Sequence, residues 1–437
     1  MSLHPVLSEK LTVALALGGP PLLTPRDARL PHVPGKVHAV IGMRRAGKTT
    51  YLHQLLAARR QAFGPERAIY LSFDDDRLAD LELAQLGMLI EEHYRRHPAL
   101  RARETVFWFL DEIQLVEGWE RFVRRVLDTE KVEIVVSGSS ARMLSREVHT
   151  SLRGRGMATT IRPFSFREYL RHRGEEPADV DLMAPAERSR VEQRFRAYLA
   201  EGGFPEAQGL LPTERIELLQ GYVDTVLFRD VVERHGVTQV TALRWLVRQC
   251  LRNPAGGFSV HRLHQDLRSQ GLGIAKDSVH ALLGHLIDAF LIAAVPLATE
   301  SERQRNSNLR KLYPADPGLI KAFDASGRAN VGHALETAVQ NELDRRGADV
   351  GYVRTRDGFE VDFLAHHVAA QPELIQVCAD PSDASTLGRE LRALEAAGAE
   401  HPRAAQRLLV LDRDGLVNVP SSSVTVQTAY SWLLTGG

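Results

Sequence analysis

The sequence has little of several features that mark whole classes of protein. Only Cys250 and Cys378 are present among 437 residues, too few for a disulfide framework or a cysteine-based zinc site. No apolar run approaches the length needed to cross a membrane, and Met1 to Lys10 lack the basic region and apolar core of a secretory signal. These absences predict a cytoplasmic protein without a membrane partner.

An excess of charge of one sign is also absent. Lys and Arg number 55 and Asp and Glu number 55, so the formal net charge is +0. The field of the whole molecule therefore cannot attract nucleic acid, and any site for DNA or RNA must be a local patch. What the chain does have is a hydrophobic fraction of 44%. Its length predicts a globular protein of about two to four domains.

A glycine-rich stretch follows the first strongly apolar run, Val37 to Ile41. Residues 42–49, GMRRAGKT, fit the pattern G-x-x-x-x-G-K-[ST], which predicts a phosphate-binding loop. Glycines let backbone N–H groups turn towards phosphate oxygens, and the helix expected after the loop presents its positive end there. A glycine turn without a ligand is the alternative. The residues expected to bind ATP are Gly42, Arg44, Arg45, Ala46, Gly47, Lys48, Thr49 and Thr50.

The metal and the base of this site are expected to come from a second apolar run. Val106 to Leu110 is typical of a buried parallel strand and ends in Asp111 and Glu112, as in a Walker B motif. Lys48 would reach the β- and γ-phosphates, and Thr49 and Asp111 would hold Mg²⁺. Glu112 is placed to polarise the water that attacks the γ-phosphate. The sequence therefore predicts ATP hydrolysis with Mg²⁺ as cofactor.

Two further strands end in polar residues. The strand expected at 132–137 ends in Ser137, which would sense the γ-phosphate or orient the water; a helix N-cap by Ser139 or Ser140 is the alternative. The strand expected at 68–73 is followed by Asp74 to Asp76. Those acids would either help to order the magnesium shell or form a solvated turn and helix N-cap.

The layout that follows resembles the AAA+ ATPases. After the strand that ends at Ser137 come an expected helix at 141–152, Arg153 and Arg155, and a strand at 157–161. In that superfamily an arginine at this place reaches the γ-phosphate bound by the neighbouring subunit. The resemblance thus implies that Arg153 or Arg155 acts in trans within a ring, a hexamer by analogy. A pair of surface arginines is the alternative.

Two more stretches narrow the resemblance. RPFSFREYL at 162–170 and YLAEGGFPE at 198–206 resemble a bacterial and archaeal group of AAA-type ATPases that carry a C-terminal DUF4143 region. Within the second stretch, residues 203–205 are similar to a lid turn of related NTPases. This likeness implies that Pro205 touches the nucleotide base and that helices over 186–234 form the lid.

The stretch from Gly236 to Leu297 predicts a winged helix. Three short helices, at 241–251, 260–269 and 276–289, precede a strand, and a basic hairpin follows. Such a module would contact DNA phosphates, although winged helices also dock proteins. The expected DNA contacts are Arg248, Arg252, Lys276, Ser278, Arg303, Arg305, Arg310 and Lys311.

The C-terminal part resembles the PD-(D/E)xK nuclease fold. From Val331 the pattern is helix, three strands, helix and strand, and the positions that match the family's site are Glu336, Asp362, Gln376 and Cys378. Where the family has Glu-x-Lys, this chain has Gln376 and Cys378. A nuclease needs that acid for its metal and that lysine for the attacking hydroxide, so we expect DNA binding without cleavage.

Together these patterns predict an α/β protein: a P-loop AAA+ parallel sheet with a helical lid, then a winged helix and a restriction-endonuclease-like domain. The expected divisions are a lead-in at 1–36, the ATPase core at 37–170, the lid at 171–235, the winged helix at 236–325 and the nuclease-like domain at 326–437. The predicted function is an ATP-dependent remodeller of DNA, branched DNA such as Holliday junctions above all. A STAND-like nucleotide switch that regulates protein partners is the alternative.

Overall fold

The structure is a computed structural model of the chain. It describes residues 2–16, 23–31, 33–138, 152, 154–301, 303–304, 309–324, 330–380, 384–416 and 423–435. Two compact units, Met1–Arg162 and Pro163–Gly437, each contain sheets and cores of their own. The first unit ends ahead of the core boundary expected at residue 170. Within the described residues, no helix is long and apolar enough to span a membrane.

The first unit is built on a five-stranded parallel sheet with the order β2-β3-β4-β1-β5. Its central strands are apolar and buried, as is usual for parallel strands covered by helices on both faces. Strand β4 separates β1 from β3, so the residue that ends β4 lies between the phosphate-loop strand and the acidic strand. The strands are β1 Val37–Ile41, β2 Ala68–Ser72, β3 Val106–Asp111, β4 Val132–Gly138 and β5 Gly156–Thr160.

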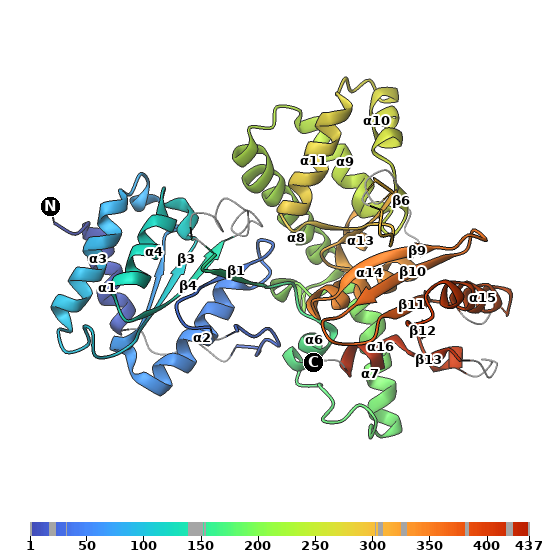
Figure 1. Ribbon diagram of the computed structural model, residues 1–437, viewed down its shortest axis with the longest axis horizontal. Coiled ribbons are helices and arrows are strands. Elements are labelled where there is room, and N and C mark those ends of the chain that lie inside the picture. The colour runs from blue at the N-terminus through green and yellow to red at the C-terminus, as the bar shows by residue number, and fades with distance from the viewer. Residues whose placement is uncertain are drawn as a thin grey trace. The chain divides into compact units, whose positions relative to one another are not determined.

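Helices cover both faces of this sheet (Figure 1). On one face, Leu52 and Leu56 of α2 share a core with Phe107 and Phe109 of β3. Trp108, which lies between these two phenylalanines, points to the other face because side chains alternate along a strand. There its ring meets that of His93 on α3, with 5.2 Å between the ring centroids. The helices are α1 Pro5–Ala16, α2 Lys48–Phe63, α3 Leu83–Arg96 and α4 Trp119–Thr129, with short 3₁₀ turns η1 Pro65–Arg67, η2 Asp76–Leu78 and η3 Ile113–Leu115.

The second unit contains a five-stranded mixed sheet with the order β13-β12-β11-β10-β9. Strands β9, β10 and β11 are antiparallel, whereas β11, β12 and β13 are parallel. Helix α14 packs with Phe363 and Ile375 on one face, and α15 packs with Leu364 and Leu374 on the other. The elements are α14 Val331–Arg345, β9 Asp349–Arg354, β10 Glu360–His366, β11 Glu373–Cys378, α15 Ala384–Glu400, β12 Ala405–Val410, η7 Arg413–Leu416, β13 Thr425–Thr428 and α16 Ala429–Leu434.

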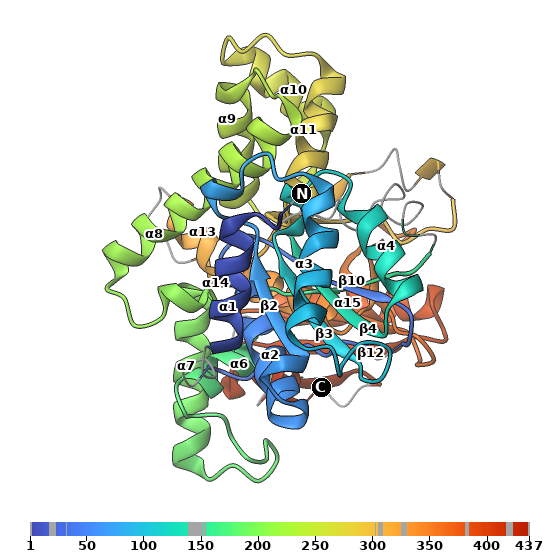
Figure 2. The same cartoon turned by 90° about the vertical axis from the view of Figure 1, so that its left-hand side faces the viewer.

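The second unit also contains a smaller antiparallel sheet with the order β6-β8-β7, whose strand β6 lies between the first two of three helices in the chain. Helices α9, α10 and α11 lie side by side in both views (Figures 1 and 2). Their boundaries agree with those expected from the sequence to within one residue. The elements are α9 Val240–Arg252, β6 Gly257–Phe258, α10 Val260–Ser269, α11 Lys276–Asp288, β7 Ile292–Val295, β8 Arg310–Pro314 and α13 Gly318–Phe323.

One hydrophobic core of the second unit draws on both of its ends. Phe166 and Phe195 belong to the same cluster as Leu335 and Trp432. The helices before residue 202, which the sequence assigned to the ATPase core and its lid, therefore pack with the C-terminal helices. The helical elements of this stretch are α6 Phe166–His172, α7 Pro185–Glu201, η5 Pro205–Ala207, α8 Pro212–Thr225 and the π-helical η6 Val226–Glu233.

Candidate nucleotide-binding site

The backbone of the loop between β1 and α2 is shaped to surround an anion, and we call this loop the phosphate cradle. Gly42 has φ +142°, and a Cβ there would lie 2.0 Å from the carbonyl oxygen of Ile161, so only glycine fits. Gly47 has φ +99° and directly precedes Lys48, the first residue of α2. Arg45 also has a positive φ, of 65°. The loop thus turns back on itself and presents the amino end of α2, which favours an anion.

Lys48 lies inside this loop. Its side chain is buried, and Nζ donates hydrogen bonds to the carbonyl oxygens of Gly42 and Met43, both at 3.1 Å. The Lys48 ammonium is thus held inside the loop by two carbonyl oxygens. Phosphate oxygens bound in the loop would replace these carbonyls as its hydrogen-bond acceptors. Thr49 and Thr50 follow in the first turn of α2, and Arg44 and Ala46 complete the loop.

The Asp111 carboxylate is the hub of the site. Thr49 donates a hydrogen bond to Asp111 Oδ2 at 2.8 Å, and Tyr70 of β2 donates to the same oxygen at 2.7 Å. Ser137, at the end of β4, donates to Asp111 Oδ1. Burial and the nearby Asp111 carboxylate raise the pKa of Tyr70 well above its ordinary value, which keeps the phenol a hydrogen-bond donor. Tyr70 was not expected, because one tyrosine in an apolar strand carries no signal of its own.

Glu112 adopts an unusual backbone conformation. Its φ is +54°, in the left-handed region, a placement that costs energy for a residue other than glycine and is concentrated at functional sites. The Glu112 N–H donates to Ser137 Oγ at 3.1 Å, and Gln114 Nε2 donates to the Glu112 carboxylate. Ser137 therefore bridges the two acidic residues, and Gln114 is a further site residue that the sequence analysis missed.

These residues fit Mg²⁺ and ATP. The loop turns at Gly47 directly before the amino end of α2, where a phosphate is favoured, and the oxygens of Thr49 and Asp111 are hard donors of the kind Mg²⁺ prefers. Across the described part of the chain, no group of three or more His, Cys, Asp and Glu residues could hold a metal ion. Mg²⁺ held by Thr49 and Asp111 would complete its coordination with phosphate oxygens and water.

The lead-in segment contributes to the walls of the site. Arg26 donates hydrogen bonds to the carbonyl of Ala46 in the loop, at 3.0 Å, and to the carbonyl of Arg162. Tyr51 of α2 donates to the carbonyl of Ala28 at 2.8 Å. Residues expected to be a simple approach to the first strand thus support the loop from outside. No local motif marks Arg26, so this role could not be found from the sequence.

The acidic run after β2 is a capped turn. Asp75 accepts a hydrogen bond from the Arg77 N–H at the start of η2, as an N-cap does. It also pairs with Lys10 at 2.9 Å and with the Arg77 guanidinium at 3.0 Å. Hydrogen bonds from Arg77 and Lys10 lower the pKa of Asp75. The N-cap interpretation is thus confirmed for Asp75, whose carboxylate pairs with cations of its own chain.

Of the two expected trans-acting arginines, Arg153 lies outside the described residues. Arg155 directly precedes β5, and its carbonyl accepts from the N–H of Val37 at the start of β1. Its guanidinium pairs with Asp128 of α4. Since the loop begins at the other end of β1, a strand of five residues, Arg155 lies roughly 16 Å from the phosphate cradle of its own chain.

Pro205 belongs to the second unit, at the start of η5. The turn before it is tightly packed: a Cβ on Gly202 would lie 1.8 Å from Asp316 Oδ1, and the Gly203 N–H donates to Asp316 Oδ2 at 2.6 Å. Burial raises the pKa of Asp316 to about 6. Within the second unit, the absence of side chains at Gly202 and Gly203 therefore lets this turn pack against the turn that contains Asp316. Contact of Pro205 with a base stays a prediction.

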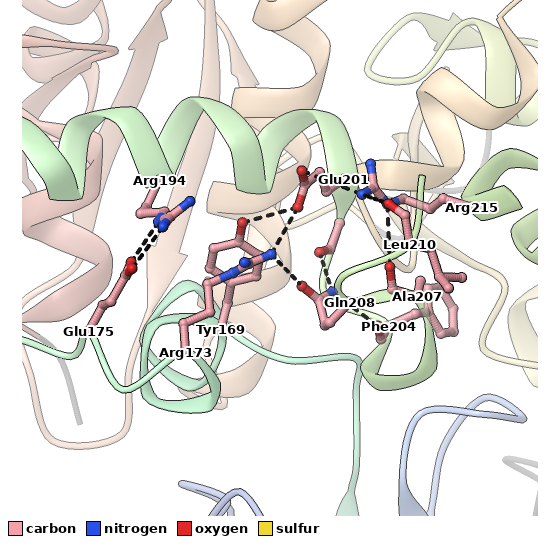
Figure 3. A network of polar contacts seen from close by, with 11 residues as sticks. Tyr169, Arg173, Glu175, Arg194, Glu201, Phe204, Ala207, Gln208, Leu210 and Arg215 are labelled. Carbon is pink, nitrogen blue, oxygen red and sulfur yellow. Dashed lines mark hydrogen bonds and ion pairs between the residues drawn. The ribbon is translucent and has the colours of Figure 1, made fainter. Parts of the chain in front are cut away.

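A polar network surrounds this turn (Figure 3). Glu201 accepts from the Tyr169 hydroxyl and from Arg173, both at 3.1 Å. Gln208 donates to the carbonyls of Gly202 and Phe204, both at 3.0 Å. The network explains why the stretch YLAEGGFPE carries an acid before its glycines: the acid joins α7 to α6.

The expected DNA contacts have different environments. Arg248 and Lys276 are exposed, and Ser278 is partly so. Arg252 is exposed and donates to the carbonyl of Phe323 at 2.8 Å. Exposed side chains also include Arg303 and Arg310, and Arg305 lies outside the described residues. The assignment of Lys311 is corrected: this side chain is 5% exposed and pairs with carboxylates, which leaves it unsuited to a phosphate contact.

The residues at the nuclease-like positions come together on α14, β10 and β11. Two hydrogen bonds join Asp362 of β10 to neighbouring residues of β11. The Asp362 N–H donates to Gln376 Oε1 at 3.1 Å, and the Val377 N–H donates to Asp362 Oδ2 at 3.0 Å. Gln376 Nε2 donates to Glu390 at 2.7 Å. Burial raises the pKa of Cys378 to about 11, so its thiol is neutral near pH 7. Glu336 lies nearby on α14.

Two family models match separate, consecutive segments of the chain. Residues 34–170 match a family model described as an AAA domain, and residues 192–329 match a domain of unknown function, DUF8612. The first match covers the phosphate cradle and the Asp111 hub. The first unit is therefore a P-loop ATPase domain of the AAA class. The likeness to a DUF4143 region and to PD-(D/E)xK nucleases stays a prediction.

Longer matches define the family. The chain is 32% identical over 378 residues to the uncharacterized protein MJ1544 of Methanocaldococcus jannaschii, covering 85% of this chain and 81% of that protein. It belongs to the family of that protein. An uncharacterized protein of Haemophilus influenzae is 28% identical over 333 residues, 75% of this chain and 79% of its own length. The solved Walker-type ATPase PABY2304 of Pyrococcus abyssi matches 73% of this chain and 95% of its own, with 14% identity and a TM-score of 0.40.

Proposed function

We propose that this chain hydrolyses ATP and uses the cycle to remodel DNA, with branched DNA such as a four-way junction as the preferred substrate. The observation that carries the ATPase part is the arrangement around Asp111. Its two oxygens accept from the P-loop threonine Thr49 and from Ser137, and Glu112 is held beside it by the same Ser137.

Each residue of the site has a role that follows from its chemistry. Lys48 binds phosphate oxygens and Thr49 and Asp111 hold Mg²⁺, which neutralises charge on the phosphates when it is bound. Glu112 takes a proton from the attacking water, and Ser137 restrains the Glu112 backbone by accepting its N–H. Gln114 restrains the other end of the Glu112 side chain.

Support for DNA binding comes from the element order in the second unit. Helix α9, strand β6, helices α10 and α11, and the pair β7 and β8 follow one another as in a winged helix. Lys276 is exposed at the first residue of α11, where the helix dipole adds to its charge. Arg248 is exposed on α9, and no Asp or Glu occurs between Arg234 and Gln265 to offset such cations.

The C-terminal mixed sheet supports binding without cleavage. Its order of α14, three strands, α15 and β12 matches the pattern expected of the PD-(D/E)xK fold. Gln376 and Cys378 stand where that fold carries an acid and a lysine, and neither can replace the lost charge at neutral pH. Arg354 and Arg356 are exposed beside this sheet and are suited to backbone phosphates.

Self-association in a ring, a hexamer by AAA+ analogy, is part of the proposal. Its support is the distance of Arg155 from the phosphate cradle of its own chain, because an arginine at that edge of the sheet can reach a nucleotide only on a neighbouring subunit.

A measurement of ATP turnover tests the DNA part. We expect four-way junction DNA to stimulate hydrolysis more than linear duplex or single strands do, and Lys48→Ala to abolish all turnover. Lys276→Ala should weaken the stimulation, with the basal rate unchanged. Arg190→Ala, which removes an exposed cation of α7, is the matched control and should leave both unchanged.

The second candidate function is a nucleotide switch that acts on protein partners. It is favoured by the formal net charge of +0 and by large exposed apolar side chains in the second unit, Leu182 at 80% and Leu211 at 63% exposure. Turnover that is indifferent to all three DNA forms would support this candidate over the remodeller.

A further inference from the structure

A single buried ammonium lies in a cluster of acids in the second unit. Lys311 belongs to β8, the middle strand of the three-stranded sheet, yet its Nζ reaches carboxylates on α14 and β10. The distances are 2.9 Å to Glu360 Oε1, 3.0 Å to Asp362 Oδ1 and 3.4 Å to Glu336 Oε1. An ammonium has three N–H donors, and here three carboxylates surround it.

The carboxylates are held from behind by other donors. The Tyr313 hydroxyl, two residues along β8, donates to Glu336 Oε1 at 2.6 Å. The Val377 N–H of β11 donates to Asp362 Oδ2 at 3.0 Å. Each of these two acids is thus held by a second donor, while Glu336 Oε1 and Asp362 Oδ1 accept from Lys311. Glu360 is the outer member, with its side chain 48% exposed.

Carboxylate oxygens are the ligands that divalent cations such as Mg²⁺ and Mn²⁺ prefer, yet with Lys311 in place no such group among the described residues could hold a metal ion. In this chain the position between the three carboxylates is occupied by Nζ of Lys311. This residue is 5% exposed and belongs to a strand outside the mixed sheet. We propose that Lys311 is a tethered cation that takes the place of a divalent metal ion and so closes this acidic cluster to metal.

The substitution has a chemical consequence. A metal ion can bind and acidify a water molecule while its protein ligands stay in place, whereas an ammonium surrounded by carboxylates has no open coordination position. The cluster therefore cannot activate water for phosphodiester cleavage. It instead ties β8 to α14 and β10, which gives the three-stranded sheet a fixed attachment to the mixed sheet. This inference does not depend on the proposed ATP or DNA chemistry.

Titration of the full chain with Mn²⁺, without nucleotide so that no phosphate completes the P-loop site, tests the proposal. Free Mn²⁺ is followed by its electron paramagnetic resonance signal. The unaltered protein should show no saturable site. Lys311→Ala should gain about one Mn²⁺ per chain with sub-millimolar affinity. The double variant with Asp362→Asn should lose that gain.

Arg310→Ala is the matched control, because it removes the same charge from the preceding, exposed residue of β8 and should gain no metal site. Thermal unfolding gives a second measurement: Mn²⁺ should raise the Tm of Lys311→Ala and leave that of the unaltered protein unchanged. If Lys311→Ala does not fold alone, recovery on refolding in Mn²⁺ supports the proposal and no recovery overturns it. A saturable Mn²⁺ site in the unaltered protein that Asp362→Asn removes would also overturn it.

Discussion

At the scale of single residues, the candidate ATPase site is organised by the number of hydrogen bonds that the Asp111 carboxylate accepts. Asp111 is 3% exposed and receives hydroxyl hydrogen bonds from α2, β2 and β4 through Thr49, Tyr70 and Ser137. If Thr49 turned to a bound Mg²⁺, Tyr70 and Ser137 would still hold the carboxylate. The orientation of Asp111 is therefore set by the neighbouring strands and does not depend on the nucleotide.

The roles of Lys48 and Glu112 can be separated by two substitutions. Lys48→Ala removes the cation inside the loop, so we expect ATP affinity to fall by about tenfold or more, since a charge-assisted hydrogen bond contributes about 1.5 kcal/mol or more. Glu112→Gln keeps the shape and removes the base, so we expect unchanged binding and hydrolysis slowed by about a hundredfold or more. Equilibrium binding of a fluorescent ATP analogue and single-turnover hydrolysis measure the two effects. Hydrolysis by Glu112→Gln at the normal rate would exclude Glu112 as the base.

The lowered pKa of His93 predicts that the free energy of unfolding falls at acidic pH. Burial lowers its pKa to about 4 from an ordinary value of 6.5, so the folded protein keeps the ring neutral while the unfolded chain takes up a proton. Its contribution is intact above pH 6.5 and declines as the pH falls towards 4. The free energy of unfolding should lose about 2 kcal/mol between pH 7.5 and pH 5 on this account.

His93→Phe should remove that part of the pH dependence, because phenylalanine cannot be protonated and still meets Trp108. Urea unfolding at the two pH values, with both proteins side by side, measures it. Since other buried groups such as Asp316 titrate in both proteins, only the difference between the proteins reports on His93. Equal pH slopes would show that folding does not lower the pKa of His93.

At the scale of elements, the docking of the turn at Gly202 against Asp316 gives a prediction with an internal control. Gly202 and Gly209 both have a positive φ, of +78° and +80°, but of the two only Gly202 would bring a Cβ into collision with another residue. Both alanine variants incur the strain of a positive φ, about 1 kcal/mol or more. Gly202→Ala should lose about 2 kcal/mol beyond that from the clash.

Urea unfolding of Gly202→Ala, Gly209→Ala and the unaltered protein measures the two costs. Equal losses in the two variants would mean that the α7 turn moves away from Asp316 without cost, and that this docking does not hold the second unit together.

The sequence predicted elements well where the signal is local. Strands such as 106–111 and helices such as 276–288 lie within a few residues of their expected bounds, because apolar period and turn residues act over short spans. The phosphate loop and Asp111 were found for the same reason: each motif fixes its own chemistry. The last strand and helix, β13 and α16, were not expected, since short elements after a glycine-containing loop give little periodicity.

What could not be predicted depends on partners far along the chain. Lys311 looked like one cation of a basic hairpin, and only the fold brings it to Asp362. Asp316 lies 113 residues from Gly203 and yet accepts its N–H. A local pattern cannot distinguish an exposed lysine from one that meets three carboxylates, because burial is decided by tertiary packing.

At the scale of the whole molecule, Arg155 predicts complementation between two inactive proteins. If it acts on a neighbour, a ring of Lys48→Ala subunits lacks a competent cradle and a ring of Arg155→Ala subunits lacks the finger. A mixture contains some interfaces with both intact, so we expect ATPase activity to appear on mixing. Asp128→Asn, which frees Arg155 from its ion pair, should keep activity.

The measurement is steady-state phosphate release across mixing ratios, with each variant alone as the baseline. Full activity of Arg155→Ala alone, or of its double variant with Arg153→Ala, would remove the trans assignment. A protein that stays monomeric by light scattering in the presence of ATP and DNA would remove the ring.

The second unit's core joins Phe164 and Phe166 to Trp432 and Leu434. During synthesis on the ribosome the first unit has all of its strands once residue 162 has emerged, and it can fold while translation continues. The second unit must wait, with large aromatic side chains uncovered, until almost the last of its roughly 270 residues has been made. Premature termination within the second unit would therefore release a folded first unit attached to an unfolded tail with exposed aromatic side chains.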